Sequence, residues 1–138
     1  KEIMNDLKPN QTNAELLTGK NILVVDDAEI NQMISRKILE KLGVVVTTAS
    51  TGLQAVNLVA KQNFDIVLMD IQMPIMDGYE ATQRIRKDEK NANLPIIAVS
   101  AAALEEDRHR SIASGMNDHI AKPFDPHTIG QILSKWIR

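Results

Sequence analysis

The chain has 138 residues, of which 43% are hydrophobic and 25% are charged, and 16 basic against 18 acidic residues give it a net charge of −2. This length fits one domain with its own core, and the absence of cysteine excludes disulfides and thiolate chemistry. No block of Lys and Arg could neutralise a row of phosphates, so we expect no nucleic acid as a partner. No apolar run reaches the ~20 residues that span a bilayer, so we expect no membrane contact by this segment.

The first nineteen residues differ in composition from the rest of the chain. They are polar, contain Pro9 and show little core periodicity, which is typical of a linker or lead-in segment. We therefore place the domain at residues 20–138. Because the chain begins at Lys1 rather than Met, we interpret it as a piece of a longer protein. The lack of cysteine fits a reducing cytoplasm, where we place the domain, whether or not a parent chain is anchored in a membrane.

From residue 20 onward, short apolar runs alternate with segments of helical periodicity, which predicts repeated βα units around a parallel sheet. The runs predict strands at residues 22–25, 44–47, 66–69, 96–99 and 119–121. Their continuous apolar character indicates burial on both faces. Helices are expected at residues 29–42, 51–62, 78–87 and 104–114, and a last helix carries an apolar stripe from Ile129 to Ile137. Gly43 and Gly115 are expected to end helices.

Polar side chains follow the strands at the points where the strands end. Asp26 and Asp27 follow the first strand, Asp70 the third, Ser100 the fourth and Lys122 the fifth. In an open α/β sheet, ligands bind outside the carboxyl ends of the strands, where the strand order reverses. In a doubly wound, flavodoxin-like sheet of order 2-1-3-4-5, that point lies between the first and third strands. We therefore expect Asp26, Asp27 and Asp70 to converge.

Three carboxylates in one crevice require positive charge. Each pair ~4 Å apart costs roughly 4 kcal/mol at an effective dielectric constant of about 20. Lys122 can supply one charge, and a divalent cation bound through oxygens supplies two. Mg²⁺ is preferred where one or two carboxylates share an octahedral shell with waters and a phosphate. Alternatively, each Asp caps the helix or turn after its strand, but capping does not account for Ser100 and Lys122 at the remaining strand ends.

Four segments resemble the response regulator receiver domain, the phosphoacceptor domain of two-component and phosphorelay signalling. They are ILVVDD at residues 22–27, LMDIQMPIMDG at 68–78, PIIAVSA at 95–101 and IAKPF at 120–124. The resemblance runs from about residue 20 to residue 137, in register with all five βα units. Any one segment is a weak signal, but their order and spacing together are highly specific. The resemblance implies the same α/β fold, with five strands and five helices.

By this resemblance, Asp70 is the nucleophile that takes a phosphoryl group from a phosphohistidine. The isolated domain is then a self-phosphorylating phosphoacceptor, and whether the whole protein is an enzyme depends on whether a parent chain carries a histidine kinase. Mg²⁺ is the implied cofactor. Asp27 and Asp70 would bind the ion directly, Asp26 would act through a bound water, and the backbone carbonyl of Gln72 would complete the protein ligands. Gln72 and Ala102 also occupy positions that tune hydrolysis of the acyl phosphate in the family.

The resemblance also implies a switch. Lys122 would pair with the phosphoryl oxygens and Ser100 would hydrogen-bond one of them, so the added charge would draw Ser100 inward. In the family, an aromatic residue three positions before the lysine rotates as the serine moves, and here that position is His119. We expect His119 to play the same steric part with an added pH sensitivity; the alternative is weaker coupling to the last strand. A cis Pro123 would fix the direction of the lysine.

The partner implied by the resemblance is a histidine kinase core or a histidine phosphotransfer domain. It would dock on the first helix and the loop after the fifth strand, so Ile30, Met33 and Ile34 face either the core or that partner. Met73 and Met76, in the loop after the third strand, either form a docking surface or pack under the loop. We expect the isolated domain to be a monomer.

Four wider interpretations can be compared. We favour the carboxyl-terminal receiver of a hybrid sensor histidine kinase, because a polar linker precedes the domain and no output domain follows it. A free-standing response regulator that acts by partner binding is the alternative. An aspartate-nucleophile phosphatase needs a second Asp two residues after the nucleophile, where this chain has Gln72. Flavin binding on the same architecture needs aromatic stacking residues, and the chain has only one Trp, one Tyr and two Phe. The phosphatase and the flavin-binding interpretations are therefore both disfavoured.

Overall fold

Five short apolar segments form one parallel sheet in the order β2-β1-β3-β4-β5, as predicted. The computed structural model describes residues 16–101, 105–122 and 124–137, without the side chains of 105–107. The strands are β1 (Asn21–Val25), β2 (Val45–Ala49), β3 (Ile66–Asp70), β4 (Ile96–Ser100) and β5 (Asp118–Ala121). β1 and β3 are direct neighbours, and their register pairs Val25 with Met69. The ends of these two strands therefore meet where the strand order reverses.

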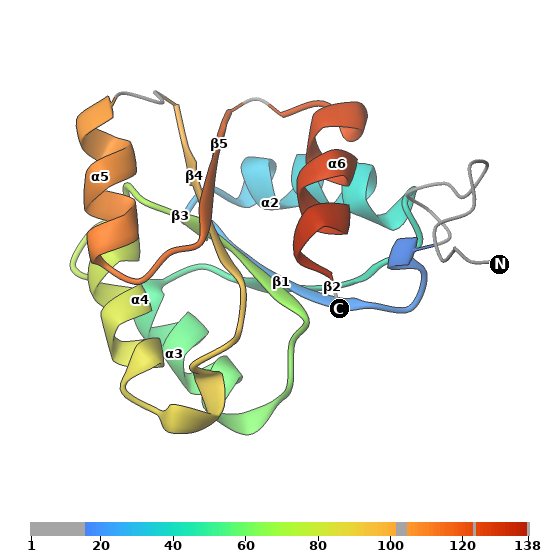
Figure 1. The fold of residues 1–138 in the computed structure, drawn as a ribbon. Helices are drawn as coiled ribbons and strands as arrows, with labels where there is room; N and C mark the ends of the chain where they lie inside the picture. The colour runs from blue at the N-terminus through green and yellow to red at the C-terminus, as the bar shows by residue number, and fades with distance from the viewer. Residues whose placement is uncertain (1–15, 102–104, 123, 138) are drawn as a thin grey trace, which may run out of the picture.

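Helices cover both faces of the sheet (Figure 1). They are α2 (Glu29–Glu40), α3 (Gly52–Lys61), α4 (Gly78–Arg86), α5 (Glu105–Ala113) and α6 (Pro126–Trp136), with a short 3₁₀ helix, η1 (Glu89–Asn91), before β4. Helices α2 and α6 lie on one face, and α3, α4 and α5 lie on the other. Within the described ranges, no helix combines the length and the hydropathy needed to cross a membrane.

Local sequence accounts for the helix ends. Thr51, Asp77 and Asp125 each precede a helix, and each side chain accepts a hydrogen bond from the backbone N–H three residues later. Such caps satisfy backbone donors that have no partner inside the helix. Gly43 and Gly115 follow α2 and α5 with φ angles of 88° and 102°, a left-handed conformation that favours glycine. The predicted helix stops are confirmed.

Two hydrophobic clusters hold the layers together. One lies between the sheet and α3, α4 and α5 and includes Leu23, Met69 and Ala98. The other lies under α2 and α6 and includes Val24 and Leu68. Because successive strand residues point to opposite faces, the central strands supply both clusters. Residues 22–25, 66–70 and 96–100 are all buried, so the predicted burial on both faces is confirmed for β1, β3 and β4. Each fully buried aliphatic side chain contributes roughly 1.5–3 kcal/mol of stability.

The second strand differs from the prediction. It spans Val45–Ala49 rather than residues 44–47, and Val45 is 52% exposed. β2 lies at the edge of the sheet and pairs only with β1 among the described strands. The expectation that this strand is buried on both faces was therefore wrong, because an edge strand has one flank open to solvent.

Packed residues also begin earlier than residue 20. Leu17 is fully buried in the cluster under α2 and α6, and the N–H of Gly19 donates to the carbonyl of Gly43 at 2.9 Å. The last part of the expected lead-in therefore packs with the domain. Residues 1–15, which make up most of that segment, lie outside the described residues.

Arg86, the last residue of α4, joins three segments at the end of the sheet opposite the Asp residues. Its guanidinium donates to the carbonyls of Asn91, Leu94 and Gly115 at 2.6–2.9 Å. It also donates to the side-chain oxygen of Asn117 at 2.7 Å. One planar group with five N–H donors thus satisfies carbonyls from the η1–β4 and α5–β5 connections, a pattern that lysine cannot reproduce.

We predict that Arg86→Met destabilises the domain by about 2–4 kcal/mol, because it leaves several carbonyls without their charged donor. Arg84→Met is the matched control on the same helix. Arg84 forms an exposed ion pair with Glu80, and its loss should cost at most about 0.5 kcal/mol. Urea unfolding of both variants measures the difference. Equal losses would show that the Arg86 hydrogen bonds add nothing beyond a surface charge.

Candidate functional site

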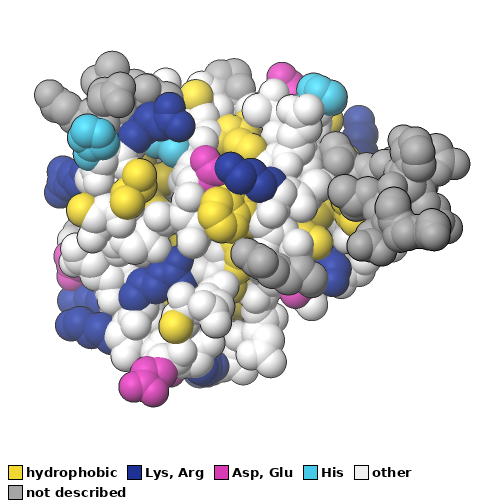
Figure 2. Space-filling model, in the orientation of Figure 1, with side chains coloured by type: hydrophobic (Ala, Val, Ile, Leu, Met, Phe, Trp, Pro, Cys, Tyr) yellow, Lys and Arg dark blue, Asp and Glu magenta, His cyan; other side chains and the backbone are white. Residues whose placement is uncertain are grey.

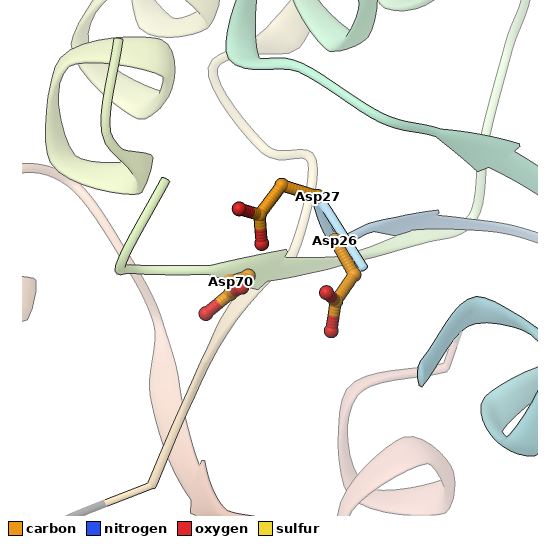
Figure 3. Close-up of side chains that lie close together, drawn as sticks. All are labelled: Asp26, Asp27 and Asp70. Carbon is orange, nitrogen blue, oxygen red and sulfur yellow. The ribbon is translucent and has the colours of Figure 1, made fainter. Parts of the chain in front are cut away.

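Three carboxylates meet at the carboxyl ends of β1 and β3 (Figure 3). Asp26 and Asp27 directly follow β1, and Asp70 is the last residue of β3. One oxygen from each carboxylate lies within 4.8 Å of the others. Asp26 and Asp70 are each only 4% exposed, whereas Asp27 is open to solvent. The convergence predicted from the strand order is confirmed.

Lys122 supplies positive charge to this cluster from the loop after β5. Its Nζ lies 2.9 Å from Oδ2 of Asp26 and 3.3 Å from Oδ2 of Asp70. Three carboxylates and one ammonium leave a formal charge of −2 in a half-buried crevice. The compensation is therefore partial, and the site retains an attraction for further cations.

The pKa values of the two central groups reflect this balance. Burial raises the pKa of Asp70 above its ordinary value, and the charge of Asp26 adds to the effect. Lys122 and the N–H of Gln72 act in the opposite direction without cancelling it. For Lys122, burial alone would lower the pKa, but the hydrogen bond to Asp26 and the charge of Asp70 raise it overall. Lys122 therefore stays protonated at neutral pH.

Asp26 is fixed by the first turn of α2. Its Oδ1 accepts hydrogen bonds from the N–H of Ala28 at 2.9 Å and from Nδ2 of Asn31 at 3.4 Å. Nε2 of Gln32 donates to the Asp26 carbonyl at 2.7 Å. The roles of Asn31 and Gln32 were not predicted from the sequence. A pair of amide side chains in the first helical turn after an acidic strand end is the signal that could have indicated them.

The loop after β3 folds back against Asp70. The N–H of Gly78 donates to the Ile71 carbonyl at 2.9 Å, and a Cβ at Gly78 would collide with the carbonyl oxygen of Asp70. The N–H of Gln72 donates to Oδ1 of Asp70 at 3.3 Å. Glycine is needed at residue 78 because the backbone of α4 approaches the end of β3 too closely for any side chain.

Packing accounts for both methionines of this loop. Met73 and Met76 are buried in the cluster under α3, α4 and α5, so of the two alternatives the structure shows packing under the loop. Ile75 between them is fully exposed with a φ of 69°, and the N–H of Met76 donates to the Pro74 carbonyl at 2.7 Å. Positive φ is strained for a β-branched residue, so the tight turn is held by the buried residues on either side.

Ser100 and His119 lie at the opposite side of Asp70 from Asp26. Ser100 ends β4 and is buried, and its Oγ lies 2.8 Å from Nε2 of His119 on β5. Both residues were predicted to belong to the site, but the hydrogen bond between them was not. Two other predicted features, the cis Pro123 and the tuning position Ala102, lie outside the described residues.

The donor set fits Mg²⁺. Asp26, Asp27 and Asp70 offer hard carboxylate oxygens, the ligands that this ion prefers in proteins. In the part of the chain that the structure describes, they form the one group of three acidic or histidine side chains close enough to share an ion. Lys122 leaves two negative charges uncompensated, which matches the charge of one divalent cation.

Comparisons with known proteins agree with this geometry. Residues 22–134 match the family model of the response regulator receiver domain. The chain is 40% identical over 118 residues to the sensor protein GacS of Pseudomonas syringae pv. syringae. This alignment covers 83% of the chain but 13% of GacS, so the chain spans about an eighth of that relative.

Solved structures show the same fold. The receiver domain of the sensor histidine kinase PA1611 from Pseudomonas aeruginosa PAO1, which has a magnesium ion coordinated in its active site cleft, is 42% identical with a TM-score of 0.80. The match covers 86% of this chain and 98% of that one. The receiver domain of Ssk1 from Saccharomyces cerevisiae, crystallised with the histidine phosphotransfer protein Ypd1, is 29% identical with a TM-score of 0.80, covering 87% and 90% of the two chains. This chain belongs to the response regulator receiver domain family.

Proposed function

We propose that this domain acts in phosphorelay signalling by accepting a phosphoryl group on Asp70 from a phosphohistidine. The carrying observation is the Asp70 carboxylate at the end of β3, within 3.3 Å of the Lys122 ammonium and beside two further carboxylates. An Asp70 oxygen forms a bond to phosphorus as the phosphorus–nitrogen bond breaks, and the donor histidine leaves. Such transfers pass through a loose transition state, so the protein mainly aligns groups and stabilises charge.

Asp27, Asp70 and the Gln72 carbonyl would hold Mg²⁺, with Asp26 acting through a water. The exposure of Asp27 and the hydrogen bonds that already occupy Asp26 support this division. When bound, the ion supplies positive charge to the equatorial phosphoryl oxygens. Lys122 pairs with one of these oxygens from its place beside Asp70.

The partner, a phosphorylated histidine domain, docks on the exposed face of α2. Ile30, Met33 and Ile34 are 63%, 50% and 51% exposed, so this stripe is free to contact a protein. Next to it, a cavity of about 100 Å³ opens beside Asp26 and Lys122, and its apolar lining includes Ile34, Ile38, Leu68, Val99 and Phe124. On the face shown in Figure 2, Lys and Arg side chains lie in separate groups with acidic ones among them, a distribution that favours a protein partner over nucleic acid.

The wider context follows from the relatives. GacS is a sensor protein and PA1611 a sensor histidine kinase, which supports a hybrid sensor histidine kinase as the parent of this domain. The receiver would lie at residues 20–138 in the cytoplasm, with Leu17 and Gly19 before it packed against it. A free-standing response regulator is the alternative. A kinase core encoded upstream in the same gene would distinguish the two.

Incubation with acetyl phosphate should add one phosphoryl group to the domain in the presence of Mg²⁺ and not in its absence. The Asp70→Asn variant should remain unmodified, because an amide is not a nucleophile for phosphorus. Intact mass measures the gain, and Asp88→Asn, an exposed cap before η1, is the matched control that should label normally. Equal labelling of wild type and Asp70→Asn would place the acceptor elsewhere.

Asp70→Asn should also stabilise the metal-free domain at neutral pH, because it removes a buried carboxylate whose charge is unfavourable there. The folded-state pKa of Asp70 is raised by burial, so ionisation opposes folding once the pH exceeds the ordinary pKa of the carboxyl. The advantage of the variant should vanish below that ordinary pKa, where the group is protonated in both states. Urea unfolding across this pH range is the measurement.

Added Mg²⁺ extends the same test. It should raise the stability of the wild type by mass action and that of Asp70→Asn much less. Asp88→Asn should follow the wild type throughout. If Asp70→Asn were less stable than the wild type at neutral pH without metal, the ionised Asp70 carboxylate would not be unfavourable in the folded domain, and the prediction would be wrong.

Met33→Lys should slow phosphotransfer from phosphorylated histidine phosphotransfer domains by about tenfold or more, since a central apolar contact is lost. It should leave labelling by acetyl phosphate unchanged, because this small donor needs no docking face. Ile112→Lys is the control, since Ile112 is 67% exposed on α5. A similar loss in both variants, measured with a panel of such domains, would argue against docking on α2.

A further inference from the structure

His119 contacts the candidate switch serine through a hydrogen bond rather than by packing alone. Its Nε2 lies 2.8 Å from Oγ of Ser100, a normal hydrogen-bond length. The strand register pairs His119 with Ala98 and Ser100 with Ala121, so this bond runs diagonally between neighbouring strands. Ala98 belongs to the cluster under α3, α4 and α5, and Ser100, two residues later, points to the same face.

The backbone around this pair is already fixed. The N–H of Lys122 donates to the Ser100 carbonyl at 2.7 Å. The N–H of His119 donates to Oδ1 of Asp118 at 2.9 Å, and Oδ2 of Asp118 accepts from Nε1 of Trp136 on α6 at 2.8 Å. The Ser100 hydroxyl can therefore rotate without movement of the backbone, and the direction of its proton depends on the group to which it is hydrogen-bonded.

A proton count limits what the pair can do. A serine hydroxyl has one proton and two lone pairs, and a phosphoryl oxygen only accepts. Ser100 must therefore donate its proton to a phosphoryl group on Asp70. The bond to His119 can persist only if Nε2 carries a proton and donates it to Oγ. Both the neutral tautomer protonated at Nε2 and the imidazolium meet this condition.

We propose that His119 is a positioning residue that donates from Nε2 to Ser100 Oγ and so directs the serine proton toward the phosphoryl group on Asp70. This rests on the proposed function and adds a regulatory connection to it. A phenyl ring at residue 119 could fill the same space but could not orient the hydroxyl. The hydrogen bond also connects Ser100 to β5, and Asp118 on β5 connects to α6 through Trp136. A change in the orientation of Ser100 should therefore affect β5 and α6 as well.

The test uses trifluoroberyllate, a tetrahedral mimic of the phosphoryl group, with Mg²⁺ and the whole 138-residue chain. His119→Phe should weaken its binding roughly three- to tenfold, the worth of one hydrogen bond. His119→Gln, which keeps an N–H donor, should restore most of the affinity. In the Ser100→Ala background, His119→Phe should have no further effect, because a positioning residue acts only through the group it positions.

Nitrogen-15 NMR of the histidine ring provides the direct readout in the trifluoroberyllate-bound wild type. A proton on Nε2 supports the proposal, and an unprotonated Nε2 that accepts from Ser100 overturns it. Wild-type affinity in His119→Phe, or the same loss in the Ser100→Ala background, also overturns it. If any of these results overturns the role of His119 but the wild type still binds trifluoroberyllate and is labelled by acetyl phosphate, the proposed phosphoryl acceptance on Asp70 stands. If the wild type does neither, both the proposed function and the role of His119 are overturned.

Discussion

Two neighbouring parallel strands end in carboxylates, and the repulsion between these carboxylates governs the rest of the site. Asp26 and Asp70 are held almost out of solvent, where like charges interact strongly. Lys122 contacts both within 3.3 Å but supplies a single positive charge. This end of the sheet therefore carries a net negative charge in the folded domain. A divalent cation offsets that charge, and a phosphoryl group brings more negative charge to the same place.

The scaffold tolerates this repulsion because both sheet faces are packed. Residues of β1 and β3 alternate between the two hydrophobic clusters, so neither strand can tilt to separate its terminal carboxylate without exposing apolar surface. Gly78 lets α4 approach the backbone of Asp70, and the first turn of α2 holds Asp26. The apolar core thus supports a polar site that is unfavourable by itself.

Sequence predicted most where the physical signal is local or repeated. Continuous apolar runs indicated the strands, and a common sheet order then brought Asp26 and Asp70 together. The start of the edge strand was not predictable, because three consecutive valines from Val44 carry no alternation that marks an open flank. Helical periodicity revealed the stripe on α2 but not whether a core or a partner covers it. The bond between Ser100 and His119 joins neighbouring strands and leaves no local signal.

The two sides of Asp70 differ in their freedom to respond. On the β1 side, Asp26 accepts hydrogen bonds from the backbone and from Asn31, and its own backbone carbonyl accepts from Gln32 on α2. These bonds oppose movement of Asp26. On the β4 side, Ser100 carries a hydroxyl that can reorient about one bond and that forms a hydrogen bond with His119. If Asp70 is phosphorylated as proposed, the added charge can reorient the Ser100 hydroxyl on the β4 side, whereas the hydrogen bonds of Asp26 to the first turn of α2 oppose a change on the β1 side.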